Sequence, residues 1–318
     1  MTNQTKILLV GSGPMAIEYA KIMQAREIPF EVIGRGEASA SQFTETTGVP
    51  VATGGLDAWL ERSAGAVPSR AIVAVSENGV GEAARALIAH GVHELLVEKP
   101  GGRDAQDIRA VQLAAREAGA RVFIGYNRRF YASTAAARKI IETDGGVTSF
   151  NFEFTEWGHV IEGLVKEPGV KEEWFLSNST HVIDLAFFLG GEPAALSAFA
   201  AGALPWHPRG AAFAGAGKTN AGALFSYQAN WAAPGRWAVE VLTRAHRLIF
   251  RPLEKLQVQK IGSVAVEFAE IDDSLDQAFK PGLAAQFDTF VGQDQAALPT
   301  IDDQVRMLDW YLRMRGDV

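Results

Sequence analysis

The chain has no cysteine among its 318 residues, which excludes disulfide bonds, thiolate metal sites and a cysteine nucleophile. Its six histidines are scattered and show no HExxH or similar spacing, so the sequence predicts no metal site. No apolar run approaches the ~18 residues that a membrane-spanning helix needs, and the first residues lack the pattern of a secretory signal. We therefore expect a cytoplasmic protein with no membrane segment.

Positive charge is also in short supply. The 30 Lys and Arg residues are outnumbered by 37 Asp and Glu residues, which gives a formal net charge of −7 and argues against a nucleic-acid partner. Apolar residues make up 47% of the chain and charged residues 21%, as in ordinary globular proteins. The length is sufficient for two domains, each with its own core.

The first 125 residues alternate short apolar runs with helical patterns. The apolar runs are KILLVGSG, FEVIGRG, AIVAVS, ELLVEKP and RVFIGYN. The intervening helical segments include DAQDIRAVQLAAREAG, for which Asp104 is the expected N-cap. Regular alternation of this kind predicts βαβ units and a doubly wound parallel sheet.

From about residue 147 the pattern changes to a period of two residues. In SFNFEFTEW, Phe150, Phe152 and Phe154 point one way, and several later segments alternate similarly. This predicts an open, mainly antiparallel sheet with one covered face, followed by two helices at the end of the chain. The small residues of AAFAGAGKTNAGA predict a loop. The stretch GAGKT (215–219) is not expected to bind phosphate, because Ala212 stands where GxxxxGK[ST] requires glycine.

A glycine-rich turn directly follows the first predicted strand. The sequence Gly11-Ser12-Gly13-Pro14-Met15-Ala16 is a GxGxxA pattern that opens the first helix. Its first glycine permits a tight turn, its second lets a pyrophosphate approach the backbone, and the small sixth residue allows helix and strand to pack. Dinucleotide binding by residues 11–15 is the interpretation we favour, and a purely structural turn is the alternative.

The choice of cofactor depends on the end of the second predicted strand. An acidic residue there usually binds the ribose diol of NAD, but this chain has Gly34-Arg35-Gly36. Glu31 lies nearby in sequence, yet it should be in the middle of the strand. Arg35 could hold a 2′-phosphate, so NADP is favoured over NAD, and an exposed turn arginine is the alternative. Ser76, after another strand of the same sheet, is a further expected cofactor contact.

Glu98-Lys99-Pro100 ends another strand of the parallel sheet. Ligands of such sheets bind at the carboxyl ends of the strands, so Glu98 and Lys99 are expected to contact the cofactor, with Lys99 towards the nicotinamide. A solvated lysine is the alternative. The proline argues against it, because it fixes the chain where Lys99 must point inward.

Together the GxGxxA turn, Glu98-Lys99-Pro100, GYNRRF (125–130) and THVIDLAFFLGG (180–191) resemble the glucose–fructose oxidoreductase / inositol dehydrogenase family. The resemblance implies an α/β Rossmann domain for dinucleotide binding (1–126), then an α+β domain for substrate binding and oligomerisation (127–318). It also implies hydride transfer between NAD(P) and a hydroxyl or carbonyl carbon of a sugar, polyol or nucleotide sugar. By the same resemblance Lys99 and His181 are the catalytic residues, and the protein is a homodimer or homotetramer through the open sheet.

One departure from the family pattern concerns the helix that carries His181. Many members have an aspartate four residues before the histidine and a glycine two before it, where this chain has Ser177 and Ser179. A serine cannot stabilise an imidazolium as a carboxylate does, so Asp184 is the remaining candidate acid, although a structural role fits it better. The serines could instead cap the helix. We therefore expect Lys99 to exchange the proton and His181 to orient the substrate oxygen.

Other polar and aromatic residues complete the expected site. The substrate-binding residues are predicted to be Asn127, Arg128, Ser177, Asn178 and His181. Arg129 is expected to form a structural ion pair. Some of the loop residues Trp157, His159, Lys166, Lys171 and Trp174 could form a wall that stacks on sugars or binds anions. Two other functions stay open: a non-catalytic NAD(P)-bound sensor, and a reductase of a non-sugar C=O or C=N bond.

Overall fold

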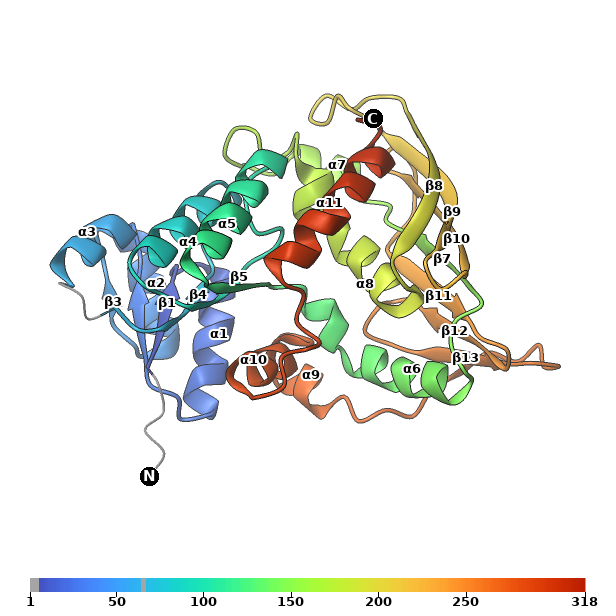
Figure 1. Ribbon diagram of the computed structural model, residues 1–318, viewed down its shortest axis with the longest axis horizontal. Coiled ribbons are helices and arrows are strands. Elements are labelled where there is room, and N and C mark those ends of the chain that lie inside the picture. Colours follow the sequence, from blue (N-terminus) through green and yellow to red (C-terminus); the bar gives the residue numbers. More distant parts are fainter. Residues whose placement is uncertain (1–5, 64–66, 318) are drawn as a thin grey trace. The chain divides into compact units, whose positions relative to one another are not determined.

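The computed structural model describes residues 6–63 and 67–317, which divide into two compact units (Figure 1). The first unit comprises the chain up to Tyr126 together with Leu283–Arg306, and the second comprises Asn127–Gly282 together with the residues from Met307 onward. The segment Leu283–Arg306 thus lies outside the second domain expected from the sequence. It contains a helix that packs on the first helix of the chain, where Arg26 forms two hydrogen bonds with Asp288.

The first unit is built on a six-stranded parallel sheet in the order β3-β2-β1-β4-β5-β6. The strands are β1 (Ile7–Val10), β2 (Phe30–Ile33), β3 (Val51–Ala52), β4 (Arg70–Val73), β5 (Glu94–Val97) and β6 (Arg121–Ile124). The helices are α1 (Pro14–Ala25), α2 (Glu37–Thr47), α3 (Gly55–Arg62), α4 (Val80–Ala89), α5 (Ala105–Ala118) and α10 (Leu283–Val291), with a short 3₁₀ turn, η1 (Glu77–Gly79). The last helix, α11 (Ile301–Arg315), begins in this unit and ends in the other.

This topology confirms the predicted doubly wound sheet. The predicted cap of α5 is also present, because the side chain of Asp104 accepts a hydrogen bond from the backbone N–H of Asp107. The two-residue strand β3 is too short to give a sequence signal. No helix of the described residues is long and apolar enough to cross a membrane.

The second unit contains an eight-stranded sheet in the order β14-β13-β12-β11-β7-β10-β9-β8. Its strands are β7 (Ser149–Glu153), β8 (Pro193–Ala201), β9 (Ala212–Thr219), β10 (Leu224–Asn230), β11 (Ala238–Leu242), β12 (His246–Phe250), β13 (Gln257–Lys260) and β14 (Glu267–Phe268). Its helical segments are the 3₁₀ turn η2 (Asn127–Phe130), α6 (Ala132–Thr143), α7 (Gly158–Glu162), the π-helical turn η3 (Phe175–Ser179), α8 (Thr180–Gly190) and α9 (Ser274–Ala278). Only β7 and β10 pair in parallel, which confirms the mainly antiparallel sheet.

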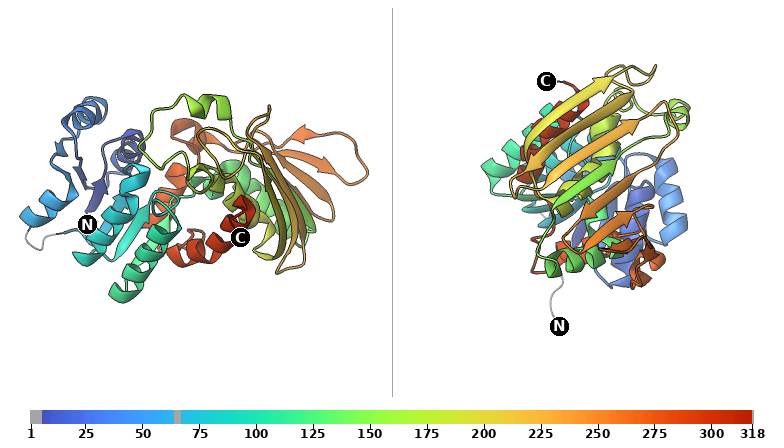
Figure 2. Two further views of the ribbon diagram at one scale, coloured as in Figure 1. Left: turned by 90° about the horizontal axis from the view of Figure 1, so that it is seen from above. Right: turned by 90° about the vertical axis from the view of Figure 1, so that its right-hand side faces the viewer.

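One face of this sheet is covered by α8, and the right-hand view of Figure 2 looks onto the other, open face. On the covered face the ring of Phe187 meets Phe150, Phe152 and Phe225 edge-on, with centroids 5.1–5.8 Å apart. Gly190 packs closely against the sheet, because a Cβ there would lie 2.3 Å from the ring of Phe150, and the helix is capped by the next residue, Gly191, which has φ of +97°. The phenylalanines of the predicted alternating strands therefore pack against α8, the helix that carries His181.

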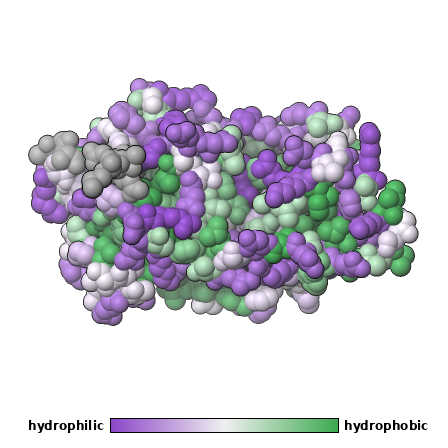
Figure 3. Space-filling model, turned by 90° about the horizontal axis from the view of Figure 1, so that it is seen from below, coloured by the Kyte–Doolittle hydropathy of each residue, from purple (hydrophilic) through white to green (hydrophobic). Residues whose placement is uncertain are grey.

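The open face exposes apolar side chains, notably Phe199 and Leu224, which are 71% and 61% exposed. The β13–β14 hairpin adds Ile261, Val264 and Phe268, and Figure 3 shows apolar side chains gathered at the end where Figure 1 draws this hairpin. The homo-oligomer expected through the open sheet stays a prediction.

The segment AAFAGAGKTNAGA is a strand and its turn, so the loop predicted there is wrong. β9 pairs with β8 and β10, and its glycines leave room for large neighbours on the covered face. A Cβ at Gly217 would lie 2.5 Å from the ring of Phe225 and 2.1 Å from the carbonyl oxygen of Ala195. A Cβ at Gly215 would lie 2.5 Å from Tyr227. Small residues here mark close packing in a sheet.

Replacing Gly217 by alanine should therefore destabilise the second unit by about 1–3 kcal/mol, because the added methyl group overpacks the sheet. Ala216→Val on the exposed face of the same strand is the matched control and should change stability by less than ~0.5 kcal/mol. Urea unfolding followed by circular dichroism measures both. Equal stability of the two variants would show that β9 does not pack as described.

Candidate active site

The glycine turn in the first unit has the geometry that a bound pyrophosphate requires. Gly11 has φ of +123°, and a Cβ there would lie 2.1 Å from the carbonyl oxygen of Ala74, so only glycine fits. Gly13 precedes α1, and a Cβ there would meet nothing within 4 Å. Pro14 starts the helix and Ala16 is fully buried. The N-terminal N–H groups of α1 thus adjoin open space, which fits an anionic cofactor.

The end of β2 places Arg35 and Glu31 in different surroundings. The carboxylate of Glu31 accepts hydrogen bonds from Lys6 Nζ at 2.6 Å and from Trp59 Nε1 at 2.9 Å. Hydrogen bonding to Lys6 lowers the pKa of Glu31. The carboxylate is therefore charged and already occupied by two hydrogen-bond donors of the first unit. Arg35 is exposed directly before Gly36, the N-cap of α2. Ser39 in the first turn of that helix shares a hydrogen bond with Ser12 at 2.9 Å.

The chain around Lys99 is fixed at several points after β5. The carboxylate of Glu98 accepts a hydrogen bond from Tyr19 at 3.1 Å, and its backbone N–H bonds Val73. Burial, and then the charge of Glu98, raise the pKa of Tyr19 well above its usual value, so this phenol stays protonated as the donor. Gln304 donates to the carbonyl of Pro100 at 3.0 Å. Lys99 therefore projects from a well-defined turn at the carboxyl end of a parallel strand. Ser76, another expected cofactor contact, lies after β4 and immediately before the 3₁₀ turn η1.

In the second unit the structure brings together Asn127, Arg128 and His181. Arg128 Nη1 donates to Asn127 Oδ1 at 2.7 Å and lies 3.1 and 3.0 Å from the two ring nitrogens of His181. Asn127 in turn donates to the carbonyl of Pro281 at 2.8 Å. His181 is only 5% exposed. The contact places a permanently charged guanidinium against the imidazole of His181.

Asp184, one turn after His181, pairs with Arg129. The guanidinium of Arg129 donates to both carboxylate oxygens, at 2.8 and 2.6 Å. Bidentate pairs of this kind are strong and geometrically specific. Arg128 and Arg129, adjacent on η2, thus hold two successive turns of α8, and the structural roles expected for Arg129 and Asp184 fit this geometry.

The residues before His181 form the π-helical turn η3, and such turns are often found at functional sites. Ser179 precedes α8, but its side chain makes no capping bond and donates instead to Glu156 at 2.9 Å. Asn178 Nδ2 also donates to Glu156, at 3.0 and 3.1 Å. Ser177 lies 3.5 Å from the carbonyl of Trp174. The alternative that these serines cap the helix through their side chains is therefore wrong for Ser179.

Glu156 is a buried carboxyl group that sequence reasoning missed. It follows β7 and is 3% exposed. Burial raises its pKa, although the hydrogen bonds from Ser179 and Asn178 act in the opposite direction. In the sequence Glu156 is simply a glutamate that follows an alternating strand. That pattern does not distinguish a buried carboxyl group from one on the surface. The structure thus places an acid against the turn before His181, although not at the position where the family has it.

Two further residues next to His181 were missed, Arg236 and Trp237. The ring of Trp237 lies 6.1 Å from that of His181 and 5.4 Å from the guanidinium carbon of Arg128. The guanidinium of Arg236 lies 5.4 Å from Trp237 and 4.6 Å from Trp157. No strand period or motif singles out this Arg-Trp pair before β11, so only the folded chain reveals it.

The loop residues that could form a wall for sugars or anions lie in different surroundings. Trp157 is 48% exposed beside Arg236, whereas Trp174 is buried against Trp206. Lys171 donates to the backbone carbonyl of Glu162 at 2.7 Å. Lys166 Nζ lies 6.0 Å from the ring of Trp174.

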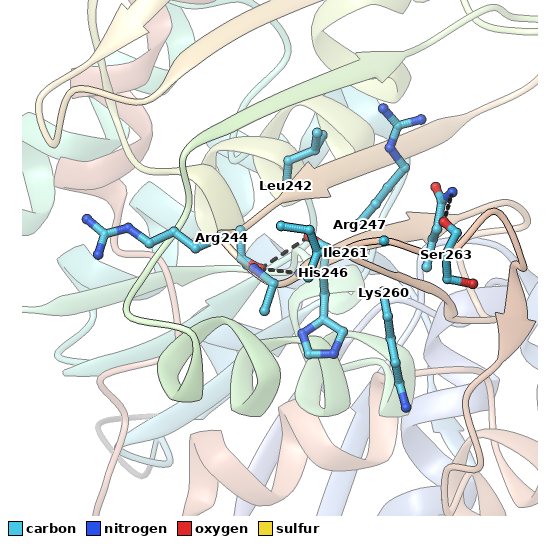
Figure 4. A pocket seen from close by; sticks show the side chains of 11 residues that line it. Leu242, Arg244, His246, Arg247, Lys260, Ile261 and Ser263 are labelled. Atoms are coloured by element: carbon cyan, nitrogen blue, oxygen red, sulfur yellow. Dashed lines mark hydrogen bonds between the residues drawn. The ribbon is translucent and has the colours of Figure 1, made fainter.

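A surface hollow of about 380 Å³ lies elsewhere in the second unit, lined by residues 242–247 and 259–263. Figure 4 shows that its Arg244, Arg247 and Lys260 side chains point away from one another. His246 there is bound to Asp144 at 2.7 Å. Because its charged groups do not converge, this hollow has no common point for a ligand.

Residues 5–126 match a family model described as "Oxidoreductase family, NAD-binding Rossmann fold". The parallel sheet and the glycine turn agree with this match, which describes residues 5–126 as the NAD-binding Rossmann fold of an oxidoreductase family. The matched model is that of the glucose–fructose oxidoreductase / inositol dehydrogenase family, and the match covers residues 5–126 of this chain. The resemblance predicted from the motifs is thus confirmed. The comparison with curated proteins finds no match for this sequence.

Solved structures share the fold over nearly the whole chain. The UDP-N-acetylglucosamine 3-dehydrogenase of Acidithiobacillus ferrooxidans has 18% identity and a TM-score of 0.74, with 99% of this chain and 97% of that chain covered. A putative NADPH-dependent oxidoreductase of Desulfitobacterium hafniense has 17% identity and a TM-score of 0.77, with coverage of 100% and 96%. A levoglucosan dehydrogenase in complex with NADH and L-sorbose has 16% identity and a TM-score of 0.79, with coverage of 98% and 97%. At these identities the likeness establishes the shared fold.

The buried carboxyl of Glu156 should make stability depend on pH. Because its folded pKa is raised above the usual 4.5, its contribution is fully present below about pH 4.5 and is lost as the pH rises through the folded value. Glu156→Gln removes this loss. The stability difference, variant minus wild type, should therefore grow with pH, by at most ~1.4 kcal/mol per unit.

Urea unfolding of both proteins between pH 4.5 and 8 measures this difference. The lowest pH is the internal control, because Glu156 then approaches the neutral form that glutamine mimics. A wild type that gains stability relative to Glu156→Gln as the pH rises would contradict the raised pKa.

Proposed function

We propose that the protein is an NADP(H)-dependent dehydrogenase or reductase that acts on a CH–OH group of a sugar, polyol or nucleotide sugar. The observation that carries the proposal is the buried imidazole of His181 on the helix that follows the π turn, held by Arg128, which itself donates to Asn127. The dinucleotide turn at Gly11 and the position of Lys99 support it. The printed names of two structural neighbours, a nucleotide-sugar dehydrogenase and a levoglucosan dehydrogenase, support a carbohydrate substrate.

In the proposed mechanism the bound nicotinamide supplies the hydride acceptor or donor. Lys99 exchanges the proton: during oxidation its neutral amine takes the hydroxyl proton as the C–H hydride leaves, and during reduction the ammonium returns it. General acid–base catalysis of this kind contributes about 10²–10⁴-fold to a rate. His181 forms a hydrogen bond with the reacting oxygen and orients it. Arg128 fixes the imidazole in place.

The proposed preference for NADP rests on Arg35 and α2. A 2′-phosphate beside Arg35 would face a guanidinium and the N-terminal N–H groups of an eleven-residue helix that also carries Ser39. The carboxylate of Glu31, which would favour the ribose diol of NAD, is bound by Lys6 and Trp59. The printed name of the Desulfitobacterium neighbour, a putative NADPH-dependent oxidoreductase, supports the same choice.

Arg35→Ala should weaken NADPH binding by about ten- to a hundred-fold, because a charge-assisted hydrogen bond to phosphate contributes about 1.5–3 kcal/mol. NADH, which lacks the 2′-phosphate, should bind the variant within ~2-fold of wild type. Fluorescence titration with each reduced cofactor measures both constants, and exposed Arg62→Ala is the matched control. An equal loss for both cofactors, or a wild type that prefers NADH, would overturn the NADP assignment.

Lys99→Met keeps the length and apolar stem of the side chain but removes the proton-exchanging amine. We expect kcat to fall by about 10²–10⁴-fold, whereas the NADPH dissociation constant should stay within ~3-fold. Steady-state kinetics on the best substrate from a panel of sugars, polyols and nucleotide sugars measures the first, and titration measures the second. Lys139→Met on the exposed side of α6 is the control. Near-normal turnover of Lys99→Met would refute its role, and tight NADPH binding with no turnover of any substrate by wild type would favour a sensor.

A further inference from the structure

Two arginines and two tryptophans form a cluster beside His181 in the second unit. Arg128 and Arg236 each lie 5.4 Å from the ring of Trp237, and Arg236 also lies 4.6 Å from the ring of Trp157. The cluster is continuous with the proposed catalytic imidazole, because Trp237 and Arg128 both contact His181. We call these four residues the arginine–tryptophan cluster.

Neither arginine of the cluster is paired with a carboxylate among the described residues. Most neighbouring arginines of the same unit are paired: Arg129 with Asp184, Arg209 and Arg315 with Glu173, and Arg251 with Glu153. Arg128 instead uses Nη1 for Asn127 and His181, and its Nε is buried without a hydrogen-bond acceptor in the described part of the chain. An unsatisfied buried donor costs about 1–3 kcal/mol, and a bound acceptor would recover this cost.

The buried acid Glu156 does not neutralise the cluster. Glu156 attracts Arg236 electrostatically, but that attraction is the smallest of the influences on its pKa. The carboxyl oxygens of Glu156 accept hydrogen bonds from Asn178 and Ser179 instead. The cluster therefore keeps unpaired positive charge next to indole rings, which supply a flat apolar surface.

We infer that the arginine–tryptophan cluster binds a carboxylate group of the substrate, so that the substrate is an acidic carbohydrate such as a sugar acid. The inference rests on the proposed function and names its substrate class. A planar guanidinium fork matches a planar carboxylate with two parallel hydrogen bonds. Trp157, which is half exposed, stacks on the C–H face of the sugar ring.

The donors that the described residues leave free in the cluster match a planar carboxylate. Arg128 Nη1 is already engaged with Asn127 and His181, so Arg236 supplies the free guanidinium fork. The carboxylate also gives the substrate a fixed orientation, because it is held on the Trp237 side of His181 while the imidazole faces the reacting oxygen. Specificity for acidic over neutral sugars then arises from Arg236, which takes no part in proton transfer.

The test compares matched acidic and neutral sugars on the full chain saturated with NADP⁺. Calorimetric titration with D-glucuronate, D-glucose, D-galacturonate and D-galactose measures binding without requiring turnover. Each acid should bind wild type at least ten-fold more tightly than its neutral partner, and added NaCl should weaken only the acids. Arg236→Gln should abolish the difference, Arg236→Lys should restore part of it, and Arg244→Gln in the surface hollow should leave it unchanged. Glucose 6-phosphate distinguishes a phosphate site from a carboxylate site.

Acids that bind no more tightly than their neutral partners, or an Arg236→Gln variant that keeps the preference, would overturn the inference. Glucose 6-phosphate binding more tightly than glucuronate would overturn the carboxylate assignment. Failure of the proposed function would look different: a preference for acids that depends on Arg236, without hydride transfer in any substrate panel, would refute the oxidoreductase mechanism and leave the carboxylate site standing.

Discussion

The contact between Arg128 and His181 is the interaction on which the proposed chemistry depends. It places a permanent cation 3.0 Å from a buried imidazole, and the adjacent Arg129 fixes the same helix through Asp184. In the proposed mechanism this contact holds the imidazole in place for a hydrogen bond with the substrate oxygen. The proposed division of labour rests on this contact: the histidine would orient an oxygen, and Lys99 would exchange the proton.

The π turn before α8 also fixes the position of the helix that carries His181. Asn178 and Ser179 on that turn are tied to the buried carboxyl of Glu156 after β7, so the start of the helix is fixed to the sheet. In many relatives an acid stands on the histidine's own helix. Here Ser177 stands at the position of that acid, Asp184 on the same helix is paired with Arg129, and the buried acid Glu156 lies on another element. The serines thus coincide with a site in which Arg128, a cation, contacts the histidine, and the inferred carboxylate site assigns the neighbouring cations to a substrate anion.

Much of the fold was predictable from the sequence, because the hydrophobic periodicity and the turn and capping residues agree with the structure in the long elements. The five main parallel strands, the Asp104 cap and the alternating phenylalanines of β7 all carry local signals. The strand β9 was not predictable, because a glycine-rich sequence is typical of a loop. Its glycines are explained only by the rings of Phe225 and Tyr227, which pack against them from the neighbouring strand. The residues of the EKP motif and the α8 helix stood out as candidates because they occur in recognisable patterns. Glu156, Arg236 and Trp237 did not, since their importance comes from contacts between segments that are distant in the chain.

The central claim is that the protein moves a hydride between a nicotinamide and a carbohydrate carbon. The most direct measurement uses NADPH with deuterium at both C4 positions of the nicotinamide, incubated with wild type and a panel of keto and aldehyde forms of acidic and neutral sugars. The proposed function predicts an alcohol product one mass unit heavier than the product obtained with unlabelled NADPH, detected by mass spectrometry. Bound cofactor with no deuterium in any product would contradict the proposed function.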